Sequence, residues 1–297
     1  GLIILGMGKL GSYELNYSSD IDLIILYDPE RSNSISSENL QIHFVRLARG
    51  LVKLLNDRTA DGYVFRTDLR LRPDPGSTPI ALSVLAAATY YESIGQNWER
   101  AAMIKARPVG GDREAANNFL EWISPFIWRK NLDFAAINDI HSIKRQITAH
   151  KGKGKFTVAG HNVKLGRGGI REVEFFTQTQ QLIWGGRLNE LRVSSTEKGL
   201  IALAKNGQIT KKVKNEMITA YRYLRRVEHR IQMINDEQTH SLPEKTEEIS
   251  DLAAFLGHKE VRYFAKELTN HLKIVEKHYG LLFEGSPSLS SEDTMSG

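Results

Sequence analysis

The stretch from Gly6 to Asp22, GMGKLGSYELNYSSDID, decides how this chain is interpreted. It connects two apolar runs, Leu2 to Leu5 and Ile21 to Tyr27, which are expected to be buried strands. Its three closely spaced glycines are Gly6, Gly8 and Gly11, and it ends in an Asp-x-Asp triplet. A glycine-rich turn beside acidic residues indicates a site for phosphate groups and cations.

Two nucleotide-binding motifs must be excluded first. The glycines spell G-x-G-x-x-G, and Asp28 stands about where a ribose-binding acid would fall in a dinucleotide-binding fold. However, a crossover to a parallel strand needs a dozen or more residues, and only Ser12 to Asp20 separate the last glycine from the next strand. A Walker A loop is excluded because Lys9 is followed by Leu10 and not by Ser or Thr.

Three carboxylates are the candidates for chemistry. The period of a strand puts Asp20 and Asp22 on one face, about 7 Å apart. Asp68 adds a third acid from an expected strand at Tyr63 to Leu71, before the turn-forming Pro73. Three carboxylates beside a phosphate-binding turn and arginines are typical of two-metal phosphoryl or nucleotidyl transfer. We therefore expect Asp20, Asp22 and Asp68 to be catalytic residues that bind Mg²⁺.

The composition narrows the class of protein. The chain has 297 residues, 41% hydrophobic and 25% charged, as in a folded protein of about two domains. Its lack of cysteine excludes disulfides, thiolate nucleophiles and cysteine-bound zinc. No membrane span or signal peptide is recognisable, so we expect a cytoplasmic protein without membrane contact. The chain opens inside an apolar run without Met, which suggests an excised fragment.

The strand pattern ends near Asp112, and helical patterns follow. We expect an α+β fold in which a catalytic domain with a mixed sheet (1–112) precedes an all-helical domain (113–285) and a disordered linker (286–297). The later helices are expected at 112–128, 131–149, 169–184, 194–206, 210–235, 246–257 and 259–283. An earlier helix, capped by Ser36 or Ser37, should end near Leu55, and Ser83 should cap a helix up to Ser93. Gly152 to Gly169 is expected to be a mobile loop or a short hairpin packed near the domain junction.

Positive charge gathers in the second part of the chain. The net charge is +5, and Ile140 to Arg171 contains eight basic residues and no acid. This stretch could bind nucleic acid, an acidic protein face or phosphorylated ligands, or it could be a solvated helix face with a lysine-rich loop. Aromatic residues are not interleaved with it, which disfavours a nucleic-acid partner.

Four motifs in order carry a resemblance to a known family. They are Gly6 to Asp22, Thr67 to Pro73 (TDLRLRP), Trp98 to Arg107 (WERAAMIKAR) and Lys164 to Phe175 (KLGRGGIREVEF). Together they resemble the bifunctional glutamine synthetase adenylyltransferase/adenylyl-removing enzymes, and the similarity extends to about residue 284. The resemblance implies a polymerase-β-like nucleotidyltransferase fold.

Details of the motifs distinguish the two homologous catalytic halves of that family. The segments Glu14 to Tyr17, Gly169 to Glu174 and Ile234 to Thr239 resemble the N-terminal, deadenylylating half. The adenylylating half typically has Gly in place of Asn16 and Val-Asp in place of Arg171-Glu172. The resemblance therefore implies phosphorolysis, in which inorganic phosphate attacks the adenylyl-tyrosine of glutamine synthetase and releases ADP. It also implies the PII signalling protein as a partner. The family's second catalytic half and the helical segment before its first strand are missing.

Further site residues follow from charge and position beside this resemblance. The residues expected to bind nucleotide or phosphate are Gly6, Gly8, Lys9, Gly11, Ser19, Arg70, Arg72, Lys105 and Arg107. The arginines could orient phosphate through two parallel hydrogen bonds or pair with nearby acids, and Lys9 could equally be a surface residue. Arg171, Glu172 and Glu174 are expected to contact substrate or the other domain, although Glu172 could simply complement a helix dipole.

Some features are expected to be structural. Trp98, Trp122, Trp128 and Trp184 are more typical of core anchors than of base-stacking surfaces. Three other functions stay open, namely adenylylation of glutamine synthetase, nucleotide transfer to RNA, and a catalytically silent module that binds glutamine synthetase or PII. The intact set of three aspartates argues against the silent module.

Overall fold

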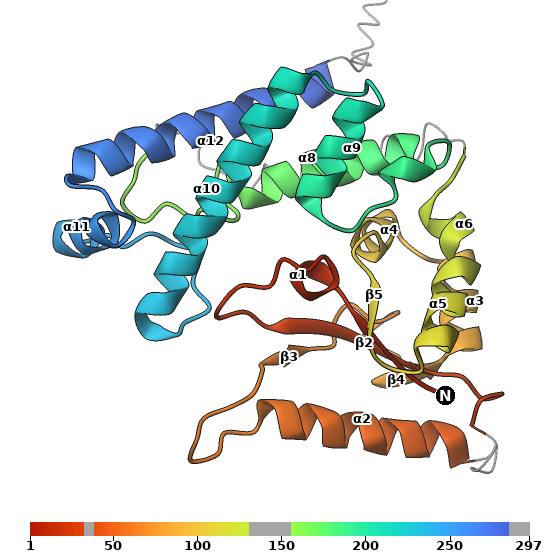
Figure 1. The fold of residues 1–297 in the computed structure, drawn as a ribbon. Helices are drawn as coiled ribbons and strands as arrows, with labels where there is room; N and C mark the ends of the chain where they lie inside the picture. The colour runs from red at the N-terminus through yellow and green to blue at the C-terminus, as the bar shows by residue number, and fades with distance from the viewer. Residues whose placement is uncertain (33–38, 131–155, 285–297) are drawn as a thin grey trace, which may run out of the picture.

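The computed structural model describes residues 1–32, 39–130 and 156–284. Figure 1 shows a sheet flanked by helices, with a second, helical part standing against one side of it. The expected cap at Ser36 or Ser37, the expected helix at 131–149 and the expected linker at 286–297 lie outside the described residues.

Five strands form a mixed sheet within the described residues. They are β1 (Leu2–Gly6), β2 (Ile21–Tyr27), β3 (Thr67–Asp68), β4 (Ala81–Ser83) and β5 (Arg107–Gly111). β2 pairs antiparallel with β1 and parallel with both β3 and β4, and β1 pairs antiparallel with β5. The mixed sheet is thus confirmed. The antiparallel β1–β2 pair also confirms that the glycine motif does not open a dinucleotide-binding crossover.

Helices cover both faces of β2. Its side chains alternate between two hydrophobic cores, one on each face of the sheet. Ile25 and Tyr27 pack with α2 (Leu40–Asn56), and the Tyr27 ring stacks on Phe44 with 4.6 Å between centroids. Ile24 and Leu26 belong to the core on the opposite face, called the sheet core below. The helices of the sheet core are α3 (Val84–Ser93), α4 (Asn97–Met103), α5 (Arg113–Trp122) and α6 (Ser124–Ile127). Asp22 has the same parity as Ile24, so its carboxylate faces this second side.

The sheet core extends beyond the expected domain boundary. Ala115, Phe119 and Ile123 of the α5–α6 region are buried in the same core as β1. Asp112 caps α5 by accepting a hydrogen bond from Ala115 N at 3.0 Å. The helices α5 and α6 therefore continue the core that is built on β1.

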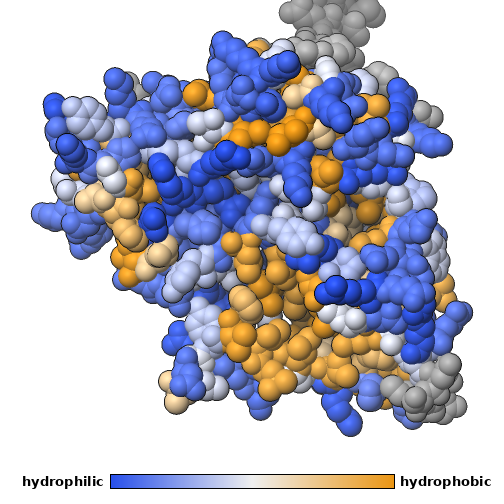
Figure 2. Space-filling model, in the orientation of Figure 1, coloured by the Kyte–Doolittle hydropathy of each residue, from blue (hydrophilic) through white to orange (hydrophobic). Residues whose placement is uncertain are grey.

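Five helices after residue 169 match the expected ones to within a few residues. They are α8 (Ile170–Trp184), α9 (Thr196–Lys205), α10 (Lys211–Asn235), α11 (Thr246–Phe255) and α12 (Val261–Glu284). Helix α8 connects the two parts. Val173 and Phe176 belong to the hydrophobic core of the helical part, while Leu182 belongs to the sheet core. Figure 2 shows hydrophobic residues gathered over the sheet and α2, whereas the helical part is mostly hydrophilic on this face.

One local expectation is wrong and a second is met only in part. The strand expected at Tyr63 to Leu71 is reduced to Thr67–Asp68, because Arg70 N donates to Asp68 Oδ1 at 2.8 Å and turns the chain directly after the aspartate. Residues 156–169 do not form a free loop. Val163 is buried and its N–H donates to His240 O at 2.8 Å, so the segment is fastened to the helical part. The remainder of that stretch, 152–155, lies outside the described residues.

A tight turn after β1 sets the position of the connection to β2. Gly8–Gly11 form the short helix α1, and a Cβ on Gly11 would lie 1.8 Å from the carbonyl oxygen of Lys105. A side chain at position 11 would therefore push α1 away from the chain that precedes β5.

We expect Gly11→Ala to lower the free energy of unfolding by about 3 kcal/mol, because backbone atoms must move to admit the methyl group. Gly50→Ala is the matched control, since Gly50 lies on an exposed face of α2 and an added methyl carbon would meet no atom within 4 Å. That control should stabilise the protein by about 0.5 to 1 kcal/mol through helix propensity. Urea denaturation measures both. Equal effects at the two positions would contradict the packing of α1.

Candidate active site

A pocket of about 360 Å³ lies where the sheet, α1, α4 and α8 meet. The expected site residues that line it are Gly8, Lys9, Ser19, Asp20, Asp22, Asp68, Arg70, Lys105, Arg171 and Glu174. Five other expected residues do not line it, namely Gly6, Gly11, Arg72, Arg107 and Glu172. Sequence reasoning did not propose as site residues Leu71, Trp98, Ala101, Ala102, Lys164, Phe175, Gln178 and Gln238, which complete the lining.

The three aspartates meet at the start of two neighbouring strands. The parallel register of β2 and β3 pairs Asp22 with Asp68, which puts their backbones about 4.8 Å apart. Asp20 stands directly before β2 and two residues from Asp22. All three line the same pocket.

Arginines hold the two outer carboxylates. Arg66 Nε donates to Asp20 Oδ1 at 3.0 Å, and Arg70 Nε donates to Asp68 Oδ2 at 2.9 Å. The hydrogen bond from Arg70 lowers the pKa of Asp68. Asp22 has no arginine partner among the described residues, and burial together with the charges of Asp68 and Asp20 raises its pKa. Asp22 is therefore the carboxylate whose charge is least compensated.

The chemistry of these donors suits a hard cation. Carboxylate oxygens are the ligands that Mg²⁺ prefers, and an uncompensated Asp22 beside Asp68 would gain from a positive charge. In residues 1–32, 39–130 and 156–284, however, no three acidic or histidine side chains are arranged so that they could hold a metal ion. Asp20 pairs with Arg66 and Asp68 pairs with Arg70, so a cation would compete with both guanidinium groups for these carboxylates.

One of the three glycines borders the pocket. Gly8 has φ +50°, and a Cβ there would lie 2.8 Å from Asp22 Oδ2. Gly6 is required by packing instead, since its Cβ would lie 2.7 Å from a methyl carbon of Val109. With Gly11 packed against Lys105, the expected cradle is reduced to Gly8.

Two expected phosphate-binding arginines have structural roles. Arg72 donates to four backbone carbonyls, including Leu69 O at 2.9 Å and Pro75 O at 2.8 Å, and so closes the loop after β3. Arg107 donates to Gly11 O at 3.1 Å and to Leu10 O at 2.8 Å, which satisfies the last carbonyls of α1. Both guanidinium groups donate to backbone oxygens, and neither lies in the lining of the pocket with the other expected phosphate-binding residues.

Lys9 pairs with the buried Glu228 of α10. Its Nζ lies 2.9 Å from Glu228 Oε2, which also accepts from Asn16 Nδ2 at 2.6 Å. Nδ1 of His240 lies 2.9 Å from the other carboxylate oxygen. Burial lowers the pKa of Lys9 to about 8 although the Glu228 charge opposes this. Burial alone would raise the pKa of Glu228, but His240, Lys9 and Asn16 hold that pKa well below its usual range.

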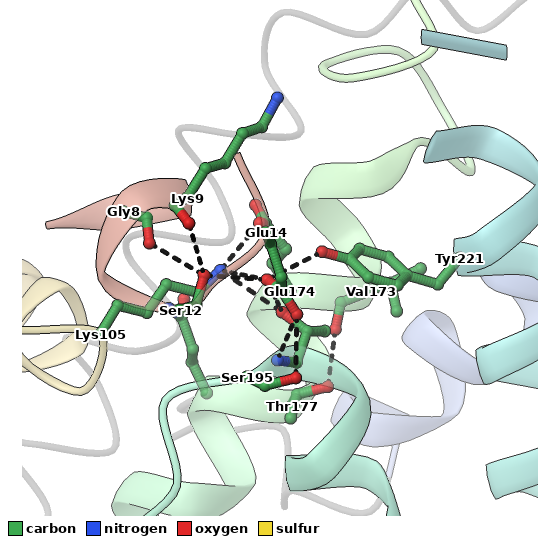
Figure 3. Close-up of polar contacts among 12 residues, drawn as sticks. Gly8, Lys9, Ser12, Glu14, Lys105, Val173, Glu174, Thr177, Ser195 and Tyr221 are labelled. Atoms are coloured by element: carbon green, nitrogen blue, oxygen red, sulfur yellow. Dashed lines mark hydrogen bonds and ion pairs between the residues drawn. The ribbon is translucent and has the colours of Figure 1, made fainter. Parts of the chain in front are cut away.

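A second carboxylate, the largely buried Glu14, fastens the same loop to the helical part (Figure 3). It accepts hydrogen bonds from Thr196 N at 2.9 Å, from Ser195 Oγ at 3.1 Å and from Tyr221 Oη at 3.1 Å. Lys105 Nζ lies 3.0 Å from Glu174 and 3.5 Å from Glu14. These contacts join the loop between α1 and β2, the segment before β5 and helices α8, α9 and α10.

The expected α8 residues divide between the pocket and the helix itself. Arg171 lies 3.7 Å from Glu174, and both line the pocket. Burial would raise the pKa of Glu174, but Lys105 and Arg171 lower it to about 2. Glu172 is buried and accepts from Gly168 N at 3.1 Å, at the start of its own helix. Contact between the parts of the chain is thus supplied by Glu174, whereas Glu172 complements the helix N-terminus.

Several residues that sequence reasoning missed carried a weak signal. Lys164 and Gln238 stand in motifs quoted for the family resemblance, and both line the pocket. Trp98 and Trp122, expected in the core, are 43% and 45% exposed. That expectation is wrong for these two tryptophans.

Among the described residues no helix combines the length and apolarity needed to cross a membrane.

Two family models match the chain. The model of glutamate-ammonia ligase adenylyltransferase matches residues 1–122, and that of the GlnD PII-uridylyltransferase matches residues 141–283. Both families transfer a nucleotidyl group, so the class that the fold and pocket define is that of the nucleotidyltransferases.

Curated proteins of one family are closely similar to the chain. The chain is 58% identical over 292 residues to the bifunctional glutamine synthetase adenylyltransferase/adenylyl-removing enzyme of Rhizobium meliloti, and 57% identical over 291 residues to that of Brucella melitensis. Each match covers 98% of this chain and 30% of the relative. The chain spans less than a third of the length of these relatives, and its similarity to them extends over nearly all of its own residues. The family resemblance of its motifs is confirmed.

We expect Glu228→Gln to lower the free energy of unfolding at pH 7 by about 3 kcal/mol, because Lys9 would lose its buried counter-charge. The folded pKa of Glu228 lies below the unfolded value of about 4.3, so its stabilisation is present above that pH and is lost as the pH falls. The difference from wild type should therefore shrink below about pH 4. Denaturant titrations at several pH values measure it.

The control for this variant is Glu248→Gln. Glu248 pairs with Lys245 at 3.1 Å, but both side chains are more than half exposed. Its loss should change the free energy of unfolding by less than about 0.5 kcal/mol at any pH. If Glu228→Gln behaved like this control, the buried ion pair would not hold the loop.

Proposed function

We propose that the chain removes AMP from the adenylyl-tyrosine of glutamine synthetase by phosphorolysis, with inorganic phosphate as acceptor and ADP as product. One observation carries the proposal: the three aspartates share their pocket with Arg70, Lys164 and Arg171. A site with carboxylates on one wall and cations around them can accept a metal ion and two phosphate groups together. The proposed fold is of the polymerase-β-like type, which agrees with the mixed sheet.

The reaction makes one bond and breaks one. An oxygen of inorganic phosphate attacks the adenylyl phosphorus, and the bond from that phosphorus to the tyrosine oxygen breaks. The tyrosine oxygen then takes a proton. Asp20, Asp22 and Asp68 would hold Mg²⁺, which neutralises charge on the transferred phosphoryl oxygens when it is bound.

The side chains around the aspartates would do the remaining work. The Arg70 side chain is 84% exposed and reaches the pocket, so its guanidinium is accessible to the attacking phosphate. Lys164 and Arg171 supply further positive charge from the helical part. Ser19 lines the pocket and donates to Asp20 O at 3.1 Å, which supports the backbone between the carboxylates.

The assignment to phosphorolysis rather than adenylylation is supported by Asn16. Its side chain donates to Glu228 at 2.6 Å and to Gln232 at 3.0 Å. A Gly at this position, as is typical of the adenylylating half, would remove both hydrogen bonds. The proposal includes a cytoplasmic location, which the absence of cysteine favours. It also includes the PII signalling protein as a regulatory partner.

The test is to incubate the chain with adenylylated glutamine synthetase, Mg²⁺ and phosphate. We expect one ADP and one unmodified tyrosine for every adenylyl group lost, with no product when phosphate is left out. Chromatography of nucleotides and mass spectrometry of the tyrosine peptide measure both.

Other outcomes would contradict this proposal and identify a different function. Transfer of AMP from ATP to unmodified glutamine synthetase would indicate adenylylation, and transfer to RNA would indicate an RNA nucleotidyltransferase. Binding of glutamine synthetase or PII without any product would indicate a silent module.

We expect Asp22→Asn to reduce turnover at least 100-fold, because a ligand of the cation is lost. The folded pKa of Asp22 is raised, so its charged form weakens the fold at pH values above the unfolded pKa of about 3.9. The melting temperature at pH 7 should therefore be equal to that of wild type or higher. Asp251→Asn, on the exposed side of α11, should change neither quantity. An unfolded Asp22→Asn protein would show that the carboxylate is structural.

A further inference from the structure

Trp98 is an exposed aromatic side chain on one wall of the pocket. It stands in the first turn of α4 and is 43% exposed, whereas large apolar side chains of the same helix region are buried. It lines the pocket together with the three aspartates and Arg70. An indole held partly in water beside charged groups is accessible to a ligand that enters the pocket.

The backbone around Trp98 is held firmly, so its exposure does not come from a frayed helix end. The next two residues, Glu99 and Arg100, are only 2% and 1% exposed. Glu99 accepts from Gln96 N at 2.8 Å, and Arg100 donates to Phe126 O at 3.0 Å and to Ile127 O at 3.2 Å. Since an indole has only two side-chain dihedrals, little conformational entropy remains to be lost when a ligand packs against it.

The pocket lining combines charged and apolar side chains. Asp22, Asp68 and Arg70 come from β2, β3 and the turn after β3, while Trp98, Ala101 and Ala102 come from α4 and Phe175 comes from α8. In Figure 1, α4 lies between the sheet and α8. Two amides, Gln178 and Gln238, also reach the lining. Such a combination suits a ligand with a charged end and a flat apolar end that carries polar edges.

Trp122 provides a comparison within the same chain. It is exposed to nearly the same degree, 45%, and lines a separate pocket of about 380 Å³. That pocket contains Asp28 and Glu30 but no lysine or arginine among its described lining. It therefore lacks the cations that would hold a phosphate group next to the ring.

We propose that Trp98 is the stacking surface for the purine base of the nucleotide, with the phosphates placed toward Asp22 and Arg70. This inference rests on the proposed function and adds to it the side chain that distinguishes nucleotides by their base. Stacking of one base on an aromatic ring contributes enough that its loss weakens binding about tenfold or more. The amides of Gln178 and Gln238 are placed to meet the polar edge of the base.

The test is calorimetric binding of diphosphates to the whole chain in the presence of Mg²⁺. ADP is compared with UDP and with ribose 5-diphosphate, which has no base. The wild-type protein should bind ADP more tightly than UDP and ribose 5-diphosphate most weakly. Trp98→Ala should lose at least tenfold in affinity for ADP, with affinity for ribose 5-diphosphate unchanged.

Two further variants separate stacking from a structural role. Trp98→Phe keeps an aromatic face and should retain most of the affinity for ADP. Trp122→Ala should bind all three diphosphates as the wild type does. ADP should quench tryptophan fluorescence in the wild type and in Trp122→Ala but not in Trp98→Phe. Thermal denaturation checks that each variant is folded.

Each contrary result has a distinct meaning. If Trp98→Ala binds ADP as tightly as the wild type, or loses affinity for ADP and ribose 5-diphosphate equally, the stacking role is wrong. If it binds ADP normally but adenylylated glutamine synthetase more weakly, the ring receives the substrate tyrosine and the proposal is overturned. A wild-type chain that binds no ADP overturns it as well.

The failure of the inference and that of the proposed function can be told apart. ADP binding that depends on Trp98, without ADP formation from adenylylated glutamine synthetase, would keep the stacking surface and remove phosphorolysis. Unchanged phosphorolysis by Trp98→Ala at low substrate concentration would keep phosphorolysis as the function and remove the stacking role of Trp98.

Discussion

The arrangement of the pocket depends on two buried carboxylates. One extends from the sheet part to the helical part, and the other extends from the helical part to the sheet part. Glu14 belongs to the loop before β2 and accepts from the first N–H of α9, while Glu228 belongs to α10 and binds Lys9 and Asn16 of that loop. A buried carboxylate costs several kcal/mol unless it is fully paired. Movement of either part would leave at least one of these charges unpaired. The loop has little regular structure of its own, so these contacts determine the position of Asp20 at the start of β2.

Much of this architecture follows from local pattern. The apolar run of β2 and the helical periods of α8 to α12 require only neighbours a few residues away, and their bounds could be predicted closely. The same holds for Asp22, because strand parity determines its face. The short β3 could not be predicted in the same way, since its end depends on Arg70 N turning toward a side chain and not toward a strand.

The site was harder to predict, because charged residues that look alike in sequence have partners far away in the chain. Arg107 meets Gly11 across 96 residues, and Lys9 meets Glu228 across 219. No spacing rule distinguishes these from Arg70, which faces the pocket. The short helix α4 reverses the usual pattern as well, because Glu99 and Arg100 are buried there and Trp98 is exposed. An argument from hydrophobicity alone assigns all three to the wrong environment.

The separation between Lys9 and Glu228 also sets the order in which the molecule can be assembled. A ribosome adds about 5 to 20 residues per second, so the loop is synthesised some 10 to 40 s before its partner on α10 exists. The pairing of β1 with β5 becomes available about halfway through that interval, since it needs residues up to Gly111. The sheet can therefore form while the loop still has water as its hydrogen-bond partner. The ion pair that holds Lys9 can form only after residue 228 has been synthesised.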